Sequence, residues 1–184
     1  MPSRLNLADT IRSIPDFPKP GILFRDITTL IANPAAFHQA IDDLANHFRQ
    51  DRIDLVAAAE ARGFIFAAPL AIKLGAGLIP IRKPGKLPGA CLSYTYELEY
   101  GTDTLQIHAD AIQPGSPARL GSRVLVIDDL LATGGTVDAC CRLVEKAGGT
   151  VVGCGFVIEL VGLGGNEKIN RYPTFSLVQY ACSE

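Results

Sequence analysis

The sequence predicts an α/β fold, in which a central and mainly parallel sheet is flanked by helices on both faces. Two stretches, about residues 53–75 and 123–160, alternate strand and helix patterns, which is typical of such sheets. Their strand portions are continuous apolar runs, as expected when a strand is covered on both faces. The chain has 184 residues, 48% of them hydrophobic, and we therefore expect one domain over residues 1–184.

The amino-terminal quarter is predicted to hold two helices separated by a loop. Residues 7–14 read as a short helix, whereas the following IPDFPKPG is too rich in proline to be helical and should form an ordered loop. Asn33 and Pro34 then make a good N-cap and first-turn pair. Apolar residues at helical spacing predict a helix from about 34 to 50: Phe37, Ile41, Leu44, Ala45 and Phe48.

The remaining chain supplies the predicted sheet. A strand at IDLVAAA (53–59) precedes a helical pattern that ends at Gly75, and a short strand at GLIPI follows. Alternating residues after the loop RKPGKLPG predict a hairpin over roughly 91–108. The last predicted elements are a strand at RVLVIDD, a helix from near Thr133 to Gly148, and strands at TVVGCGFVIEL and FSLVQY.

Composition and charge exclude several classes of protein. The formal net charge is −2, without a basic patch suited to a nucleic-acid backbone. No apolar run approaches the roughly 20 residues that cross a bilayer, and the amino terminus lacks a signal-peptide pattern. The five cysteines form no CxxC pair and no zinc spacing, so we expect free thiols in a reducing compartment. These features predict a cytoplasmic protein with neither a nucleic-acid nor a membrane partner.

The run VLVIDDLLATGGT (124–136) carries the most specific chemistry. Its buried strand delivers two adjacent carboxylates, Asp128 and Asp129, which repel phosphate but can accept hydrogen bonds from paired ribose hydroxyls. The loop after them can turn N–H groups and hydroxyls toward a phosphate at a helix N-terminus. That loop contains Ala132, Thr133, Gly134, Gly135 and Thr136. The pattern indicates a ribose phosphate site, and the chain has no Walker A motif.

The chain resembles the type I phosphoribosyltransferases, and among them the adenine-specific members. Besides DDLLATGGT, the segments that carry the resemblance occur in the family's order: FPKPGILFRDIT, EARGFIF, IRKPGKLPG, LEYG and FSLVQY. The resemblance implies a small N-terminal hood (about 1–33), a β-hairpin flap (about 91–108) and a homodimer. It also implies transfer of the 5-phosphoribosyl group from phosphoribosyl pyrophosphate to adenine, giving AMP and pyrophosphate. Mg²⁺ is the expected cofactor, held by substrate oxygens and water rather than directly by protein side chains.

The resemblance assigns two loops to the pyrophosphate. The first is Glu60, Ala61, Arg62 and Gly63, in which backbone amides and the Arg62 fork would hold the leaving group. Related enzymes often hold the peptide corresponding to Glu60–Ala61 in the cis form. The second is the cationic loop with Arg82, Lys83 and Lys86. Arg62 is also expected to act in catalysis.

The resemblance places the base in the N-terminal hood. Phe24 would stack on the purine, with the backbone of Leu23 and Arg25 at its polar edge and Leu160 on the opposite side. A carbonyl beside an N–H complements adenine, whereas a 6-oxo base presents the reverse pattern. Members that use 6-oxopurines carry a lysine in the strand after the phosphate helix, and FVIEL has none. No role follows for Glu159.

The flap and two departures from the family pattern complete the comparison. Glu99 and Tyr100 match a mobile flap, in which the glutamate would contact the base and manage its proton during attack. The segment QPGSPARLGSRV has extra residues, and ACSE extends beyond the usual final QY. Two alternatives remain open: an enzyme for another base, xanthine or orotate, and a regulatory protein that senses phosphoribosyl pyrophosphate without turnover. Arg62, Glu99 and the lack of a DNA-binding extension argue against the second.

Overall fold

A five-stranded parallel sheet forms the centre of the computed structural model, which describes residues 4–97, 101–112 and 121–181. Its spatial order is β4-β3-β7-β8-β9, and every neighbouring pair is parallel. The bounds of these strands are Leu55–Ala59 (β3), Gly77–Ile81 (β4), Arg123–Leu131 (β7), Thr150–Val161 (β8) and Thr174–Ala181 (β9). This is the fold class that the strand and helix patterns predicted.

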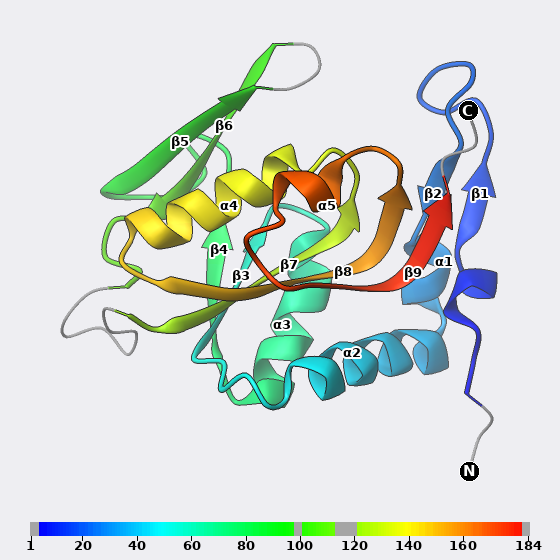
Figure 1. Ribbon diagram of the computed structural model, residues 1–184, viewed down its shortest axis with the longest axis horizontal. Coiled ribbons are helices and arrows are strands. Elements are labelled where there is room, and N and C mark those ends of the chain that lie inside the picture. The colour runs from blue at the N-terminus through cyan, green and yellow to red at the C-terminus, as the bar shows by residue number, and fades with distance from the viewer. Residues whose placement is uncertain (1–3, 98–100, 113–120, 182–184) are drawn as a thin grey trace.

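Helices cover both faces of the sheet (Figure 1). Helix α4 (Gly135–Lys146) packs on one face, while α2 (Pro34–Phe48) and α3 (Gly63–Leu74) pack on the other. Side chains of β7 alternate between the two cores, since Val124 and Val126 belong to the first and Leu125 and Ile127 to the second. The continuous apolar strands of the sequence are thus explained by burial on both sides.

Capping residues set the start of α2 and the end of α3 where the sequence predicted them. The Asn33 side chain accepts hydrogen bonds from the N–H groups of Ala35 and Ala36, so α2 starts at Pro34 as expected. Helix α3 ends before Gly75, whose φ of 69° suits glycine. Helix α4 starts at Gly135, two residues after the predicted Thr133, because Gly134 has a left-handed backbone with a φ of 78°.

Two antiparallel hairpins lie outside the central sheet. The predicted hairpin over 91–108 is confirmed as β5 (Cys91–Glu97) and β6 (Thr102–His108), which pack beside α4. A smaller hairpin joins β1 (Arg12–Ile14) to β2 (Phe24–Asp26). Two short helices, α1 (Thr28–Ala32) and α5 (Gly165–Lys168), were not predicted.

The predicted helix over residues 7–14 is wrong beyond its first turn. A 3-10 helix covers Leu7–Thr10, and β1 then runs in the extended conformation. Strand β1 pairs with β2, where Arg12 lies opposite Asp26 and bonds to its carboxylate with Nε at 3.1 Å and Nη2 at 2.5 Å. A partner strand twelve residues further along the chain therefore overrides the local helical pattern.

Three of the four cysteines in the described residues lie inside the protein, and Cys182 lies outside those residues. Cys140, Cys141 and Cys154 are buried and free, and the sulfur atoms of Cys141 and Cys154 are 3.6 Å apart. Burial raises the pKa of Cys140, and the hydrogen bond with Cys154 together with burial raises that of Cys141. Cys91 is free and partly exposed. None of the helices in the described part of the chain is long and apolar enough to cross a membrane.

Candidate active site

The sheet order brings three loops to one edge. Strands β4, β3 and β7 are neighbours and parallel, so their carboxyl ends lie side by side. The loop after β3 begins at Glu60, the loop after β4 at Arg82, and the loop after β7 at Ala132. Ligands of open parallel sheets bind outside this edge. The two segments assigned to pyrophosphate and the ribose phosphate motif therefore meet, although they are far apart in sequence.

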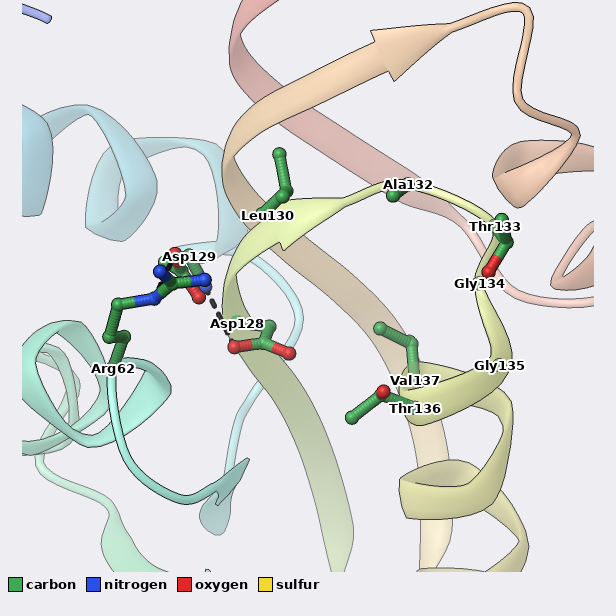
Figure 2. A pocket seen from close by; sticks show the side chains of 10 residues that line it. All are labelled: Arg62, Asp128, Asp129, Leu130, Ala132, Thr133, Gly134, Gly135, Thr136 and Val137. Atoms are coloured by element: carbon green, nitrogen blue, oxygen red, sulfur yellow. Dashed lines mark hydrogen bonds and ion pairs between the residues drawn. The ribbon is translucent and has the colours of Figure 1, made fainter. Parts of the chain in front are cut away.

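A cavity of about 200 Å³ lies between the β7–α4 loop and Arg62 (Figure 2). Gly134 has a φ of 78°, which turns the chain from the end of β7 into α4. The first turn of α4 therefore opens toward the cavity, where its free N–H groups and helix dipole favour an anion. The lining consists of Arg62, Asp128, Asp129, Leu130, Ala132, Thr133, Gly134, Gly135, Thr136 and Val137.

Asp128 and Asp129 form a tightly packed acid pair. Asp128 Oδ1 accepts a hydrogen bond from the Asp129 N–H at 2.9 Å, and Asp129 Oδ2 lies 2.9 Å from Arg62 Nε. Burial raises the pKa of both carboxyls; the charge of Asp129 raises that of Asp128 further, while Arg62 opposes the rise at Asp129. A Cβ atom at Gly63 would lie 3.0 Å from Asp128 Oδ1, so glycine allows the β3 loop to approach the pair closely.

The Glu60 side chain organises the cationic loop. Its carboxylate accepts a hydrogen bond from the Lys83 N–H at 2.6 Å and binds Arg82 Nη2 at 2.8 Å. The Lys83 N–H, followed by Arg82, lowers the pKa of Glu60. Arg82 Nη1 donates to the Lys86 carbonyl at 3.2 Å, while Lys83 Nζ lies 3.2 Å from Asp103 of β6. The Glu60–Ala61 peptide bond is cis, which confirms that expectation.

The residues assigned to the base lie outside the cavity lining. Phe24 is on β2, where its ring packs edge-on against Phe17 with centroids 5.1 Å apart. The Arg62 guanidinium carbon is 5.9 Å from the Phe24 ring centroid, which links the base side to the acid pair. Leu23 is 46% exposed, and the Arg25 guanidinium lies over Tyr180. Leu160, on β8, packs against the apolar core that contains α2 and α3.

The hairpin β5–β6 contributes a residue that sequence reasoning missed. The Tyr96 hydroxyl lies 3.4 Å from the Thr136 hydroxyl, and its ring carbons would lie 3.5 Å and 3.6 Å from a Cβ atom at Gly135. Burial raises the pKa of Tyr96. Its position two residues after Tyr94 in an alternating strand is the only sequence signal. Glu99 and Tyr100 lie outside the described residues.

Glu159, which the sequence left without a role, is buried beside the phosphate loop. Its register partners are Leu131 of β7 and Gln179 of β9. Its Oε1 accepts a hydrogen bond from Asn166 Nδ2 at 3.3 Å, and its Oε2 accepts one from Gln179 Nε2 at 2.9 Å. The signal available in the sequence was a carboxylate inside an otherwise apolar strand.

Together these features define an α/β protein whose sheet edge is suited to a sugar phosphate. Comparison with known proteins agrees, because the model of the phosphoribosyl transferase domain matches residues 27–178. An adenine phosphoribosyltransferase of Solibacter usitatus is 57% identical over 175 residues, which cover 95% of this chain and 98% of the relative.

Solved structures give the same result. Adenine phosphoribosyltransferase from Thermoanaerobacter pseudethanolicus superposes with a TM-score of 0.89 at 50% identity, covering 95% of this chain and 98% of the other. The Saccharomyces cerevisiae enzyme, solved with an imino-altritol bisphosphate and adenine, gives 0.86 at 40% identity, covering 93% and 96%. The chain therefore belongs to the phosphoribosyltransferase family, in the branch of the adenine phosphoribosyltransferases.

Proposed function

We propose that this chain transfers the 5-phosphoribosyl group from phosphoribosyl pyrophosphate to adenine, giving AMP and pyrophosphate. The observation that carries the proposal is the adjacency of the acid pair, the phosphate loop and Arg62 around one cavity. The names of its relatives support adenine as the acceptor base. The reaction needs no protein nucleophile, because a ring nitrogen of adenine attacks the anomeric carbon as pyrophosphate leaves.

The cavity is suited to the ribose 5-phosphate part of the substrate. N–H groups of the loop from Ala132 to Thr136 and the two threonine hydroxyls would hold the 5′-phosphate. Asp128 and Asp129 would accept hydrogen bonds from the ribose hydroxyls. Burial raises the pKa values of both carboxyls, so donors from a bound sugar would stabilise the ionised pair.

Arg62 and the cationic loop are proposed to receive the pyrophosphate. Arg62 uses Nε to hold Asp129, which leaves its two terminal nitrogens to face an anion. Gly63 and Ala61 would contribute backbone amides, and Lys83 and Lys86 would add charge. The Glu60 carboxylate holds Arg82 and the Lys83 N–H. The proposed role of Glu60 is therefore to fix the cationic loop rather than to contact the anion.

Mg²⁺ is the proposed cofactor, and the contacts of the acid pair indicate which oxygens would bind it. The described residues contain no group of three or more metal-binding side chains, and Asp129 is already paired with Arg62. A metal would thus be held chiefly by pyrophosphate and ribose oxygens, with Asp128 and Asp129 acting through the sugar hydroxyls. When bound, it neutralises charge that develops on the leaving group.

The base is proposed to lie between Phe24 and Leu160, with the backbone of Leu23 and Arg25 reading its polar edge. The half-buried ring of Phe24 and its approach to Arg62 support this placement. Glu99 and Tyr100 are proposed as flap residues that close over the base. We further propose a single domain with a hood at about 1–33 and a flap at about 91–108.

A homodimer in the cytoplasm is the proposed state. Helix α3 and its neighbour β4 carry three exposed apolar side chains, Ile65 at 38%, Ile72 at 82% and Leu78 at 40% exposure. Burying these side chains against a second copy would remove them from water. Sedimentation equilibrium of the parent and of Ile72→Glu tests this: a monomeric parent, or an unweakened dimer in the variant, would contradict the proposal.

The function itself is tested by base competition. Purified protein with Mg²⁺ and phosphoribosyl pyrophosphate should form AMP from adenine at a far higher kcat/KM than product from hypoxanthine, guanine, xanthine or orotate. Preference for xanthine or orotate would assign another base. Substrate binding without turnover of any base would favour a sensor.

A further inference from the structure

The short helix α5 lies with its backbone directly against the phosphate loop. A Cβ atom added at Gly165 would be 2.2 Å from the Ala132 carbonyl oxygen, and one added at Gly134 would be 2.8 Å from the Gly165 carbonyl oxygen. Such distances exclude any side chain between the two segments. The place of α5, which lies near the start of α4 in Figure 1, therefore limits where Ala132 and Gly134 can lie.

A chain of hydrogen bonds holds α5 to the sheet. Asn166, the residue after Gly165, donates from Nδ2 to Glu159 Oε1 at 3.3 Å and accepts at Oδ1 from the Thr174 hydroxyl at 2.8 Å. Glu159 also accepts from Gln179 Nε2 at 2.9 Å. The links thus connect the ends of β8 and β9 with α5, and α5 with the phosphate loop.

The carboxylate of Glu159 determines which groups of this network donate hydrogen bonds and which accept them. An ionised carboxylate can only accept, so the Asn166 amide must turn its nitrogen toward Glu159 and its oxygen toward Thr174. Glu159 is 7% exposed, and the hydrogen bonds that its carboxylate accepts from described residues come from amide groups rather than cations. A buried carboxylate is costly unless it is hydrogen-bonded, so keeping both amides in place stabilises this arrangement.

We propose that Glu159 is a positioning residue for phosphoribosyl pyrophosphate: through Asn166 it holds Gly165 against Ala132 and Gly134 and so fixes the loop that receives the 5′-phosphate. This rests on the proposed function only in taking that loop as the phosphate site. Glu159 touches neither substrate nor the reacting atoms. Loosening the network should weaken phosphate binding most, because α5 contacts the phosphate loop directly. Leu160, the neighbour of Glu159 in β8, packs instead against the core that contains α2 and α3, and Phe24 lies across Arg62, so adenine binding should change much less.

The test reverses the polarity of the network. Asn166→Asp places a second carboxylate against Glu159, and repulsion should move α5 from the loop. We expect the KM for phosphoribosyl pyrophosphate to rise about tenfold while the KM for adenine stays within about twofold. In Glu159→Gln/Asn166→Asp the new amide donates to the new carboxylate and still accepts from Gln179. This double variant should return the KM to within about threefold of the parent.

Asn170→Asp is the matched control, because it makes the same chemical change at another exposed asparagine, just beyond α5, whereas the hydrogen bond to Glu159 comes from Asn166. Its kinetic constants should equal those of the parent. Thermal unfolding of each variant separates loss of fold from loss of binding. The proposal is overturned if Asn166→Asp leaves the KM for phosphoribosyl pyrophosphate unchanged, if both KM values rise together, or if the double variant fails to recover.

Titration with ribose 5-phosphate alone separates this inference from the proposed function. Weaker binding in Asn166→Asp and recovery in the double variant would support the network even if the parent formed no AMP from adenine. AMP formation by the parent with unchanged ribose 5-phosphate affinity in Asn166→Asp would overturn the network and leave the enzyme assignment intact.

Discussion

The phosphate side and the base side of the site are built on different supports. Asp128 and Asp129 lie near the carboxyl end of β7, the middle strand of the five-stranded sheet, and the phosphate loop follows that strand. Phe24 lies on β2, which pairs only with the three-residue β1 in the described chain. A central strand is fixed by neighbours on both sides, whereas a two-stranded ribbon is marginal by itself. The phosphate side is therefore expected to be preformed and the base side adaptable.

The two regions also differ in how the ionisation of their carboxyl groups affects the stability of the fold. The acid pair is packed against the protein and its pKa values are raised, so ionisation there opposes folding. Asp26, at the end of β2, has its pKa lowered to about 2 by hydrogen bonds from Thr28 and Arg12, so its ionisation favours folding. Removing a carboxylate from the acid pair should therefore impair function without lowering stability, whereas removing that of Asp26 should lower stability.

The largest expected effect is that of Asp128→Asn on the phosphate side. It removes an acceptor for a ribose hydroxyl, and kcat/KM should fall about 100-fold. Stability at pH 8 should be equal to or above that of the parent. Because the folded pKa of Asp128 lies above the ordinary value of 3.8, the parent loses stability as pH rises from 3.8 through the raised pKa. Melting temperatures of both proteins at pH 5 and pH 8 check this; a Tm deficit that grows with pH in the variant would contradict it.

The second effect concerns the phosphate loop. Thr133→Val with Thr136→Val removes two hydroxyls that face the cavity, and the KM for phosphoribosyl pyrophosphate should rise about tenfold with the adenine KM unchanged. Thr150→Val, at the exposed start of β8 and away from the carboxyl edge of the sheet, is the control and should change neither KM. Equal effects on both substrates would break the proposed division between the two sides.

The third effect should be confined to the base side. Phe24→Leu keeps an apolar side chain but loses the stacking face, so the adenine KM should rise about fivefold while that for phosphoribosyl pyrophosphate stays constant. Phe17→Leu tests whether the ring that packs against Phe24 matters only as support. If only the KM for phosphoribosyl pyrophosphate changed, Phe24 would belong to the phosphate side, and the proposed base site would be contradicted.

The smallest effect is on stability. Asp26→Asn removes the carboxylate that binds Arg12 and Thr28, and Tm at pH 7 should fall by about 3 °C. Because the folded pKa of Asp26 is about 2 and its ordinary value is 3.8, the stabilisation is complete above pH 3.8 and disappears as pH falls toward 2. The difference in Tm between the parent and Asp26→Asn should therefore be smaller at pH 3 than at pH 7. Asp110→Asn, at an exposed site, should show no difference at either pH.

The central sheet and its helices, which carry the phosphate side of the site, could be predicted from sequence because the patterns that specify them are local. Apolar runs, the cap at Asn33 and the stop at Gly75 each act over a few residues, and parallel pairing follows from the alternation of elements. The N-terminal side depends on a distant partner: Arg12 is extended because β2 lies opposite it. Tyr96 and Glu159 depend likewise on contacts with Thr136 and Asn166, 40 and 7 residues away, which no periodicity reveals.

The buried thiols provide a reporter of opening in the core. Cys140 and Cys141 lie on α4 and Cys154 on β8. Burial raises the pKa of Cys140, and the hydrogen bond with Cys154 together with burial raises that of Cys141, so both stay protonated at neutral pH. An aromatic disulfide reagent can reach them only when α4 separates from the sheet, so the rate of labelling measures the free energy of that separation. Because α4 begins at the phosphate loop, ribose 5-phosphate should slow the labelling of these thiols and leave that of Cys91 unchanged. Ligand affinity could then be followed through sulfur chemistry at sites that the ligand does not touch.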